Sequence, residues 1–123
     1  MNQTDTTAEK GYKKLIVWKK ADELVVEIYK ATKAFPKDEQ YGLMSQLRRA
    51  AVSIAANLVE GYGRQNKGEL RQFTNIALGS LAETEYLLSL SWRLTFIPQT
   101  DYARLEALRS EVGKLLWRFY KSL

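Results

Sequence analysis

The sequence contains no cysteine and no histidine, and only two prolines. Without cysteine the chain forms no disulfide and no thiolate, which is compatible with a reducing, intracellular environment. Without histidine it excludes Ser-His-Asp and Cys-His nucleophile systems, His-containing zinc sites and Glu-x-x-His di-iron bundles. We therefore expect a protein that is not an enzyme and that needs no cofactor and no metal.

Long apolar runs are also absent. No stretch approaches the ~20 apolar residues that a membrane-spanning helix needs, and the polar first eleven residues do not resemble a signal peptide. We therefore expect a cytoplasmic protein with no membrane partner. Its 123 residues suffice for one domain with a real core. The net charge of +5 is spread along the chain, which permits nucleic-acid binding and equally fits an ordinary basic surface.

Helical periodicity is interrupted at three places, by the two prolines and by a glycine-rich segment at residues 61–68. The interruptions leave four segments of helical length, at about residues 15–34, 38–60, 67–97 and 100–121, after a flexible polar arm at residues 1–14. Asp38 and Thr100 are candidate N-caps, and Gly61 is the expected C-terminal stop of the second helix. The sequence thus predicts an all-α domain of four helices.

The third segment is apolar on almost every side. Its main stripe consists of Ile76, Leu87, Leu90 and Leu94. Leu78 and Phe96 point nearly opposite to this stripe, and Trp92 lies in a third direction. A bundle buries one stripe per helix, so the apolar residues outside the main stripe predict contact with a second copy of the chain. Trp117 and Tyr120 of the fourth segment can contribute to the same contact. The alternative is a central helix in a tight monomer.

Glu83 falls within the main apolar stripe of the third segment. A buried carboxylate is costly unless it is paired, and Arg48 and Arg49 of the second segment are the candidate partners. We expect a structural ion pair that sets the register between the two helices. The alternatives are a general acid or a metal ligand, but one carboxylate without a nucleophile or a second ligand makes no active site.

Residues 61–68 superficially suggest a phosphate-binding loop, but they lack the GK[ST] ending and the preceding strand. Basic residues nevertheless gather there and at the start of the third helix, where free N–H groups favour anions, and Tyr62 can stack on a base. A second basic cluster is formed by Lys10, Lys13, Lys14, Lys19 and Lys20. The candidate phosphate contacts are Lys19, Lys20, Arg64, Lys67 and Arg71. The alternative is an exposed turn and arm with ordinary charges.

Several stretches of the sequence resemble a known family. They are LIVWKKA at 15–21, Phe35-Pro36-Lys37, Tyr41-Gly42-Leu43, QLRRAAVSI at 46–54, Asn57, Glu60-Gly61, Gly63-Arg64 and ALGSLAE at 77–83. Together they are similar to the bacterial four-helix-bundle proteins encoded in intervening sequences of large-subunit ribosomal RNA genes. The resemblance extends over nearly the whole chain, from Leu15 to Leu123.

The resemblance implies an up-down-up-down antiparallel four-helix bundle and a ring-shaped homo-oligomer, a pentamer. It also implies kinship with the accessory variability determinant of diversity-generating retroelements, a basic bundle that pairs with a reverse transcriptase and RNA. We therefore expect a non-enzymatic oligomer that acts as a scaffold for structured RNA. The alternative is an accessory subunit that contacts a reverse transcriptase through Trp117, Tyr120 and other apolar residues left outside the core.

Overall fold

The computed structural model describes residues 11–123, which form four α-helices joined by short connections. The helices are α1 (Ile16–Thr32), α2 (Leu43–Gly63), α3 (Lys67–Arg93) and α4 (Gln99–Ser122). Two short 3-10 helices, Gly11–Lys14 and Lys37–Glu39, precede α1 and α2, and residues 11–123 include no strand. The expectation of an all-α fold with four helices is confirmed. None of the described helices is long and apolar enough to cross a membrane.

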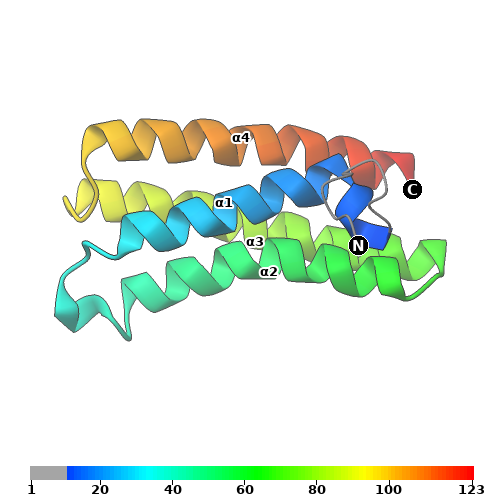
Figure 1. Cartoon of the computed structure of the whole chain (residues 1–123), viewed down its shortest axis with the longest axis horizontal. Helices are drawn as coiled ribbons and strands as arrows, with labels where there is room; N and C mark the ends of the chain where they lie inside the picture. Colours follow the sequence, from blue (N-terminus) through cyan, green and yellow to red (C-terminus); the bar gives the residue numbers. More distant parts are fainter. Residues whose placement is uncertain (1–10) are drawn as a thin grey trace, which may run out of the picture.

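The four helices lie side by side along the long axis of the molecule (Figure 1). α2 lies against α1 and α3, and α4 also lies against α1 and α3. The α1–α2 and α3–α4 connections are at one end of the long axis, and the α2–α3 connection is at the other (Figure 1). This placement is compatible with the up-down-up-down arrangement that the family resemblance implies.

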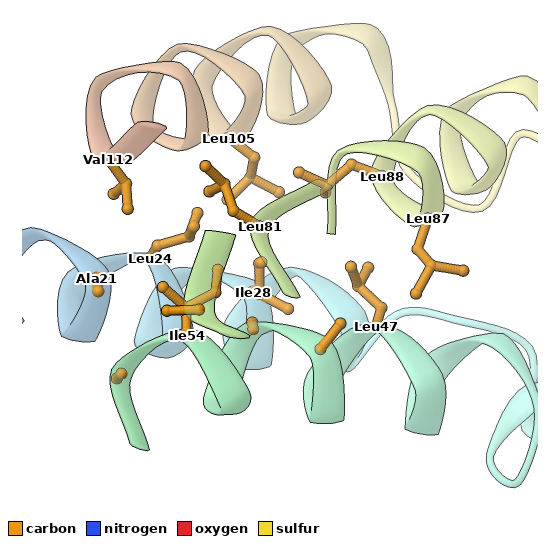
Figure 2. Close-up of a cluster of buried hydrophobic side chains, with 14 of the residues drawn as sticks. Ala21, Leu24, Ile28, Leu47, Ile54, Leu81, Leu87, Leu88, Leu105 and Val112 are labelled. Atoms are coloured by element: carbon orange, nitrogen blue, oxygen red, sulfur yellow. The ribbon is translucent and has the colours of Figure 1, made fainter. Parts of the chain in front are cut away.

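The core is built from apolar side chains spaced three or four residues apart, so that those of one helix fall on one face. Figure 2 shows such side chains from all four helices meeting between the ribbons, among them Leu24, Ile28, Leu47, Ile54, Leu88, Leu105 and Val112. These seven are almost completely buried. Burying each of them contributes roughly 1.5–3 kcal/mol, so this packing accounts for most of the favourable free energy of folding.

The buried face of α3 is rich in hydroxyl groups. Thr74, Thr84 and Ser91 are all fully buried. Each hydroxyl donates to the carbonyl four residues earlier in α3, at 2.7–2.8 Å, so that no described buried side-chain polar atom lacks a partner. The Ser53 hydroxyl of α2 and the Ser80 hydroxyl of α3 also share a hydrogen bond of 2.7 Å.

The starts of α2 and α4 differ from the sequence prediction. Asp38 lies in the short 3-10 helix before α2, and it is the Glu39 carboxylate that accepts from the Leu43 N–H, at 2.9 Å. α4 begins at Gln99, after Pro98, with no side-chain cap. Both predicted N-caps, Asp38 and Thr100, are therefore wrong, because a preceding turn and a proline begin these helices instead.

Gly61 does not end α2, which continues to Gly63. Gly61 is buried, and a Cβ atom placed on it would lie 2.8 Å from the Cβ of Phe73 on α3. Glycine is therefore needed here for the close approach of two helices and not as a stop. α3 also ends earlier than predicted, at Arg93, and Thr95 just after it has a left-handed φ of 64°.

Part of the predicted N-terminal arm is structured. The predicted arm comprises residues 1–14. Residues 1–10, which include Lys10, lie outside the described residues. Gly11–Lys14 forms a 3-10 helix that contacts α1 and α2, and the Tyr12 ring meets the Trp18 ring edge-on at 4.9 Å. These four residues thus have a defined conformation and pack against α1 through this aromatic contact, in a segment where the sequence predicts a flexible arm.

Candidate nucleic-acid interface

Positive charge is concentrated in one half of the bundle. The starts of α1 and α3, the end of α2 and the end of α4 lie at the same end of the long axis (Figure 1). We call residues 11–24, 54–80 and 111–123 the basic half, because they contain ten Lys and Arg against five Asp and Glu. The opposite half, residues 25–53 and 81–110, contains eight against seven. The fold thus brings the described members of the two predicted basic clusters to one end.

At the seam between α1 and α4, Lys14 and Arg118 line a shallow hollow of about 420 Å³ together with Leu115 and Phe119. Lys20 lies further along α1 and forms ion pairs with Glu23 at 3.6 Å and with Glu111 of α4 at 3.5 Å. Lys19 is exposed. The ammonium of Lys20 is therefore partly neutralised, whereas Lys14 and Arg118 add unbalanced charge to this seam.

At the α2–α3 connection, Arg64 forms an ion pair with Glu60 at 2.9 Å, and its guanidinium lies 5.2 Å from the centre of the Phe73 ring. Lys67 is exposed and has no ion pair among the described residues. Half-buried Tyr62 lines a mostly apolar hollow with Lys67. Of the two predicted phosphate contacts in this connection, Lys67 is therefore the more available.

Between α3 and α4, two stacked aromatic rings lie between two cations. The Arg71 guanidinium lies 4.3 Å from the centre of the Tyr120 ring, and the Tyr120 ring stacks on Trp117 with centres 5.8 Å apart. The Lys121 ammonium lies 5.6 Å from the centre of the Trp117 ring. We call these four residues the aromatic row. It spans two helices and includes one predicted phosphate contact and two residues that the sequence assigned to a contact with another chain.

A hollow of about 450 Å³ lies beside the aromatic row. Its lining residues are Gly68, Arg71, Gln72, Asn75 and Tyr120. The sequence analysis missed Gln72 and Asn75, although their spacing from Arg71 places all three on neighbouring positions of one helix face. Nothing in the sequence alone indicates that Tyr120 of α4 lies beside that face.

The residues predicted to contact another chain fall into two groups. Leu78 and Phe96 pack against the core, and the Phe96 ring lies 5.5 Å from that of Phe35. Trp92 stacks on Tyr102 at 4.7 Å and is 37% exposed, whereas Trp117 is 52% exposed. Within one chain, Trp92 and Trp117 therefore keep more exposed surface for a partner than Leu78 and Phe96 do.

The predicted buried ion pair is wrong. Glu83 is exposed and pairs with neither Arg48 nor Arg49 among the described residues. Arg48 instead turns to α1, where its Nε donates to the Thr32 hydroxyl at 2.7 Å and its Nη2 donates to the Tyr29 carbonyl at 3.2 Å. The physical reason is the rotation of α3. Its hydroxyl-rich face is buried, and in the stripe around Glu83 only Leu87 is buried, whereas Ile76 and Leu94 are exposed.

Arg49 and Glu83 do line one hollow of about 350 Å³ between α2 and α3, together with Gln46, Ala50 and Ser53. Both side chains are exposed, and neither has a hydrogen bond or ion pair among the described residues. They are neighbours across the surface of two helices and not a buried pair.

Arg109 of α4 is the most buried cation in an ion pair, with a side chain 11% exposed. Its guanidinium donates to both carboxylate oxygens of Glu106, at 2.9 and 2.6 Å, and lies 3.5 Å from Glu85 of α3. The hydrogen bond to Glu106 raises the pKa of Arg109 above its ordinary value, and burial opposes this. The pair of Arg109 with Glu85, which links α3 to α4, is not among the ion pairs predicted from the sequence.

Acidic groups do not gather into a metal site in the part of the chain that the structure describes. No group of three or more aspartate or glutamate side chains there could hold a metal ion. The carboxylates instead lie singly or beside arginine and lysine, as in the Glu106, Glu111 and Glu60 pairs. The concentrated cations are therefore the main chemical feature of the described surface.

Comparison with known proteins identifies a family and a similar solved structure. Residues 13–118 match the family described as 23S rRNA-intervening sequence protein. A crystal structure of a protein with unknown function from the S23 ribosomal protein family of Bacteroides thetaiotaomicron is 30% identical, with a TM-score of 0.79. The match covers 86% of this chain and 99% of that one. No curated protein matches the sequence.

Proposed function

Because the chain belongs to the 23S rRNA-intervening sequence protein family, we propose that it is a non-enzymatic scaffold that binds RNA through its basic half. The observation that carries the proposal is the gathering of ten lysines and arginines against five acidic residues at one end of the bundle. Such a surface attracts the RNA backbone, since phosphate contacts supply most of the sequence-independent affinity of nucleic-acid-binding proteins.

The positions of the cations support this proposal. Lys14 comes from the 3-10 helix before α1, Lys67 and Arg71 come from the start of α3, and none of the three has an acidic partner among the described residues. An ion pair within the protein competes with phosphate binding, so unpaired cations are the stronger candidates. Lys20 and Arg64 contribute less in this proposal, because Glu111 and Glu60 already neutralise part of their charge.

Self-association is the second part of the proposal. The outward side of α3 exposes Ile76 and Tyr86, and Trp92 is also more than one-third exposed. Apolar side chains of this size on one helix favour contact with another copy of the chain. A pentamer, as the family resemblance implies, would repeat the basic half five times and so increase the avidity for an extended RNA.

The experiment is RNA binding measured against salt concentration. For the native protein we expect submicromolar affinity for a structured RNA near physiological salt. The log–log slope should correspond to about −0.9 per phosphate contacted in a duplex and about −0.7 in a single strand. Lys14→Gln with Lys67→Gln should weaken binding and flatten this slope. Lys33→Gln with Lys37→Gln removes the same charge from the opposite half and should change neither.

Failure of the native protein to bind RNA at low salt would overturn the proposal. Equal effects of the two double variants would also overturn it, because binding would then follow total charge and not the basic half. In the first case, binding to a purified reverse transcriptase from a diversity-generating retroelement becomes the next measurement. That result would support the accessory-subunit alternative and the kinship with the accessory variability determinant.

A further inference from the structure

The seam between α3 and α4 differs from the rest of the basic half, because its cations lie against exposed aromatic rings. Phosphate binding requires only positive charge and N–H donors. It gives no reason for the Trp117 ring, more than half exposed, to stack on Tyr120 beside Arg71 and Lys121. Exposed rings of this kind, next to cations, are the ordinary means by which proteins hold unpaired bases.

We infer that this seam is a site for unpaired nucleotides, in which one base stacks on the Trp117–Tyr120 pair. The inference rests on the proposed RNA binding and specifies the class of RNA. In a duplex the faces of the bases are covered by their neighbours, so an exposed ring finds no face to stack on. A single-stranded segment offers both its base faces and its phosphates to the aromatic row.

The hollow beside the row supplies groups for the edge of a base. The Gln72 and Asn75 amides line it, and neither is used in a hydrogen bond to another group among the described residues. Each amide has donors and an acceptor, which suits the polar edge of a nucleobase. The volume of about 450 Å³ lies within the roughly 300–1,000 Å³ of small-molecule sites.

The two cations of the row lie where the phosphates of a stacked strand must pass. Arg71 is held against the Tyr120 ring and presents a flat guanidinium with several donors, which suits a phosphate or the face of a second base. Lys121 lies near the Trp117 ring at the end of α4. The two stacked rings thus lie in the middle of the row, with one cation against each of them, so that a base stacked on the rings has a positive charge on either side.

The experiment compares a labelled single-stranded RNA of twelve nucleotides with the duplex of the same sequence, by fluorescence anisotropy. Trp117→Leu and Tyr120→Leu remove a ring but no charge. We expect each to weaken single-strand binding by about tenfold and to leave duplex binding and the salt slopes unchanged. Trp117→Phe and Tyr120→Phe keep a ring and should stay within about threefold of the native protein.

A matched control exists in the opposite half, where Trp92 stacks on Tyr102. Trp92→Leu removes an equivalent stacked ring outside the basic half and should leave the affinity for the single strand unchanged. Circular dichroism and native mass spectrometry of every variant establish that fold and assembly are retained.

Three results would overturn the inference. The first is leucine variants that bind the single strand like the native protein, and the second is an equal loss on single strand and duplex. The third is a lower native mass of these variants, which would assign the rings to contact between copies. All three leave the proposed RNA binding in place. Absence of native binding to both RNAs would overturn the proposed function as well.

Discussion

The two halves of the bundle use the same residue types for different purposes. In the opposite half, Arg48, Arg104 and Arg109 each bond to a neighbouring helix. In the basic half, within the described residues, only Lys20 forms an ion pair with another helix, to Glu111. Arginine thus bonds to polar groups of another helix in the opposite half, whereas in the basic half Arg64 and Arg71 lie against aromatic rings. The excess of positive charge identifies the basic half, and the lack of acidic partners identifies which of its cations are available.

One pair of aromatic residues in each half shows a related contrast. Phe35 and Phe96 lie 5.5 Å apart in the opposite half, and Phe35 is only 5% exposed, so these rings close that end of the core. In the basic half the Trp117 ring remains largely exposed beside cations. The opposite half is therefore expected to carry more of the stability, and the basic half more of the binding.

The largest effect is expected at the closed end of the core. Phe35→Ala removes a buried ring and should lower the free energy of unfolding by about 3–5 kcal/mol, as measured by urea denaturation. Phe35→Leu keeps most of the volume and should cost less than about 1.5 kcal/mol. If the alanine variant lost under about 1 kcal/mol, the closed end would not stabilise the bundle and the contrast between the halves would fail.

A smaller effect is expected for the arginine that bridges α1 and α2. Arg48→Leu removes two donors to α1 and should lower the free energy of unfolding by about 1.5–3 kcal/mol. Arg49→Leu, at the next residue, removes an exposed cation without a partner and should change it by less than about 0.5 kcal/mol. Similar values for the two variants in chemical denaturation would contradict a structural role for Arg48.

In the basic half, stability is expected to depend on the close approach of α2 and α3. Gly61→Ala places a Cβ 2.8 Å from Phe73 and should destabilise by about 1–3 kcal/mol, although alanine favours helix. Gly79→Ala meets nothing within 4 Å and should stabilise by up to about 1 kcal/mol. Thermal unfolding of the two variants measures their changes in stability. If Gly61→Ala and Gly79→Ala changed the stability in the same direction, α2 and α3 would not approach so closely.

The smallest effect is expected for Glu83. Because the carboxylate is exposed and has no partner among the described residues, Glu83→Ala should change the free energy of unfolding by less than about 0.5 kcal/mol. The measurement is urea denaturation at low and high salt. A loss of 3–5 kcal/mol would instead mean that this carboxylate is buried against an arginine, as the sequence alone suggests.

The sequence predicts the number of helices well, because apolar residues three and four apart and the two prolines define them. It does not predict how α3 is rotated. Thr74, Thr84 and Ser91 count as polar in any periodicity, yet they are buried because their hydroxyls bond within the helix. The wrong prediction for Glu83 has the same cause. The stripe that contains Glu83 was taken for the buried face of α3.

The candidate interface was predictable in part. Arg71 and Lys67 follow from the clustering of basic residues after a glycine-rich turn. The contact of Arg71 with Tyr120 was not predictable, because the two are 49 positions apart and meet only once α3 and α4 are packed. The close approach of Gly61 to Phe73 was not predictable either. Gly61 was predicted to end a helix, but its missing side chain instead leaves room for Phe73.

Few polar contacts fix the position of α3 along the axis of α2, because the buried hydroxyls of α3 bond within their own helix. Thr74, Thr84 and Ser91 bond only to their own helix, and the described residues place one hydrogen bond between α2 and α3 side chains, from Ser53 to Ser80. A slide of one turn, about 5.4 Å, would keep the three internal bonds and break this one. Among the side-chain hydrogen bonds of residues 11–123, this serine pair is therefore the one that distinguishes the observed alignment of α2 and α3 from an alignment shifted by one turn.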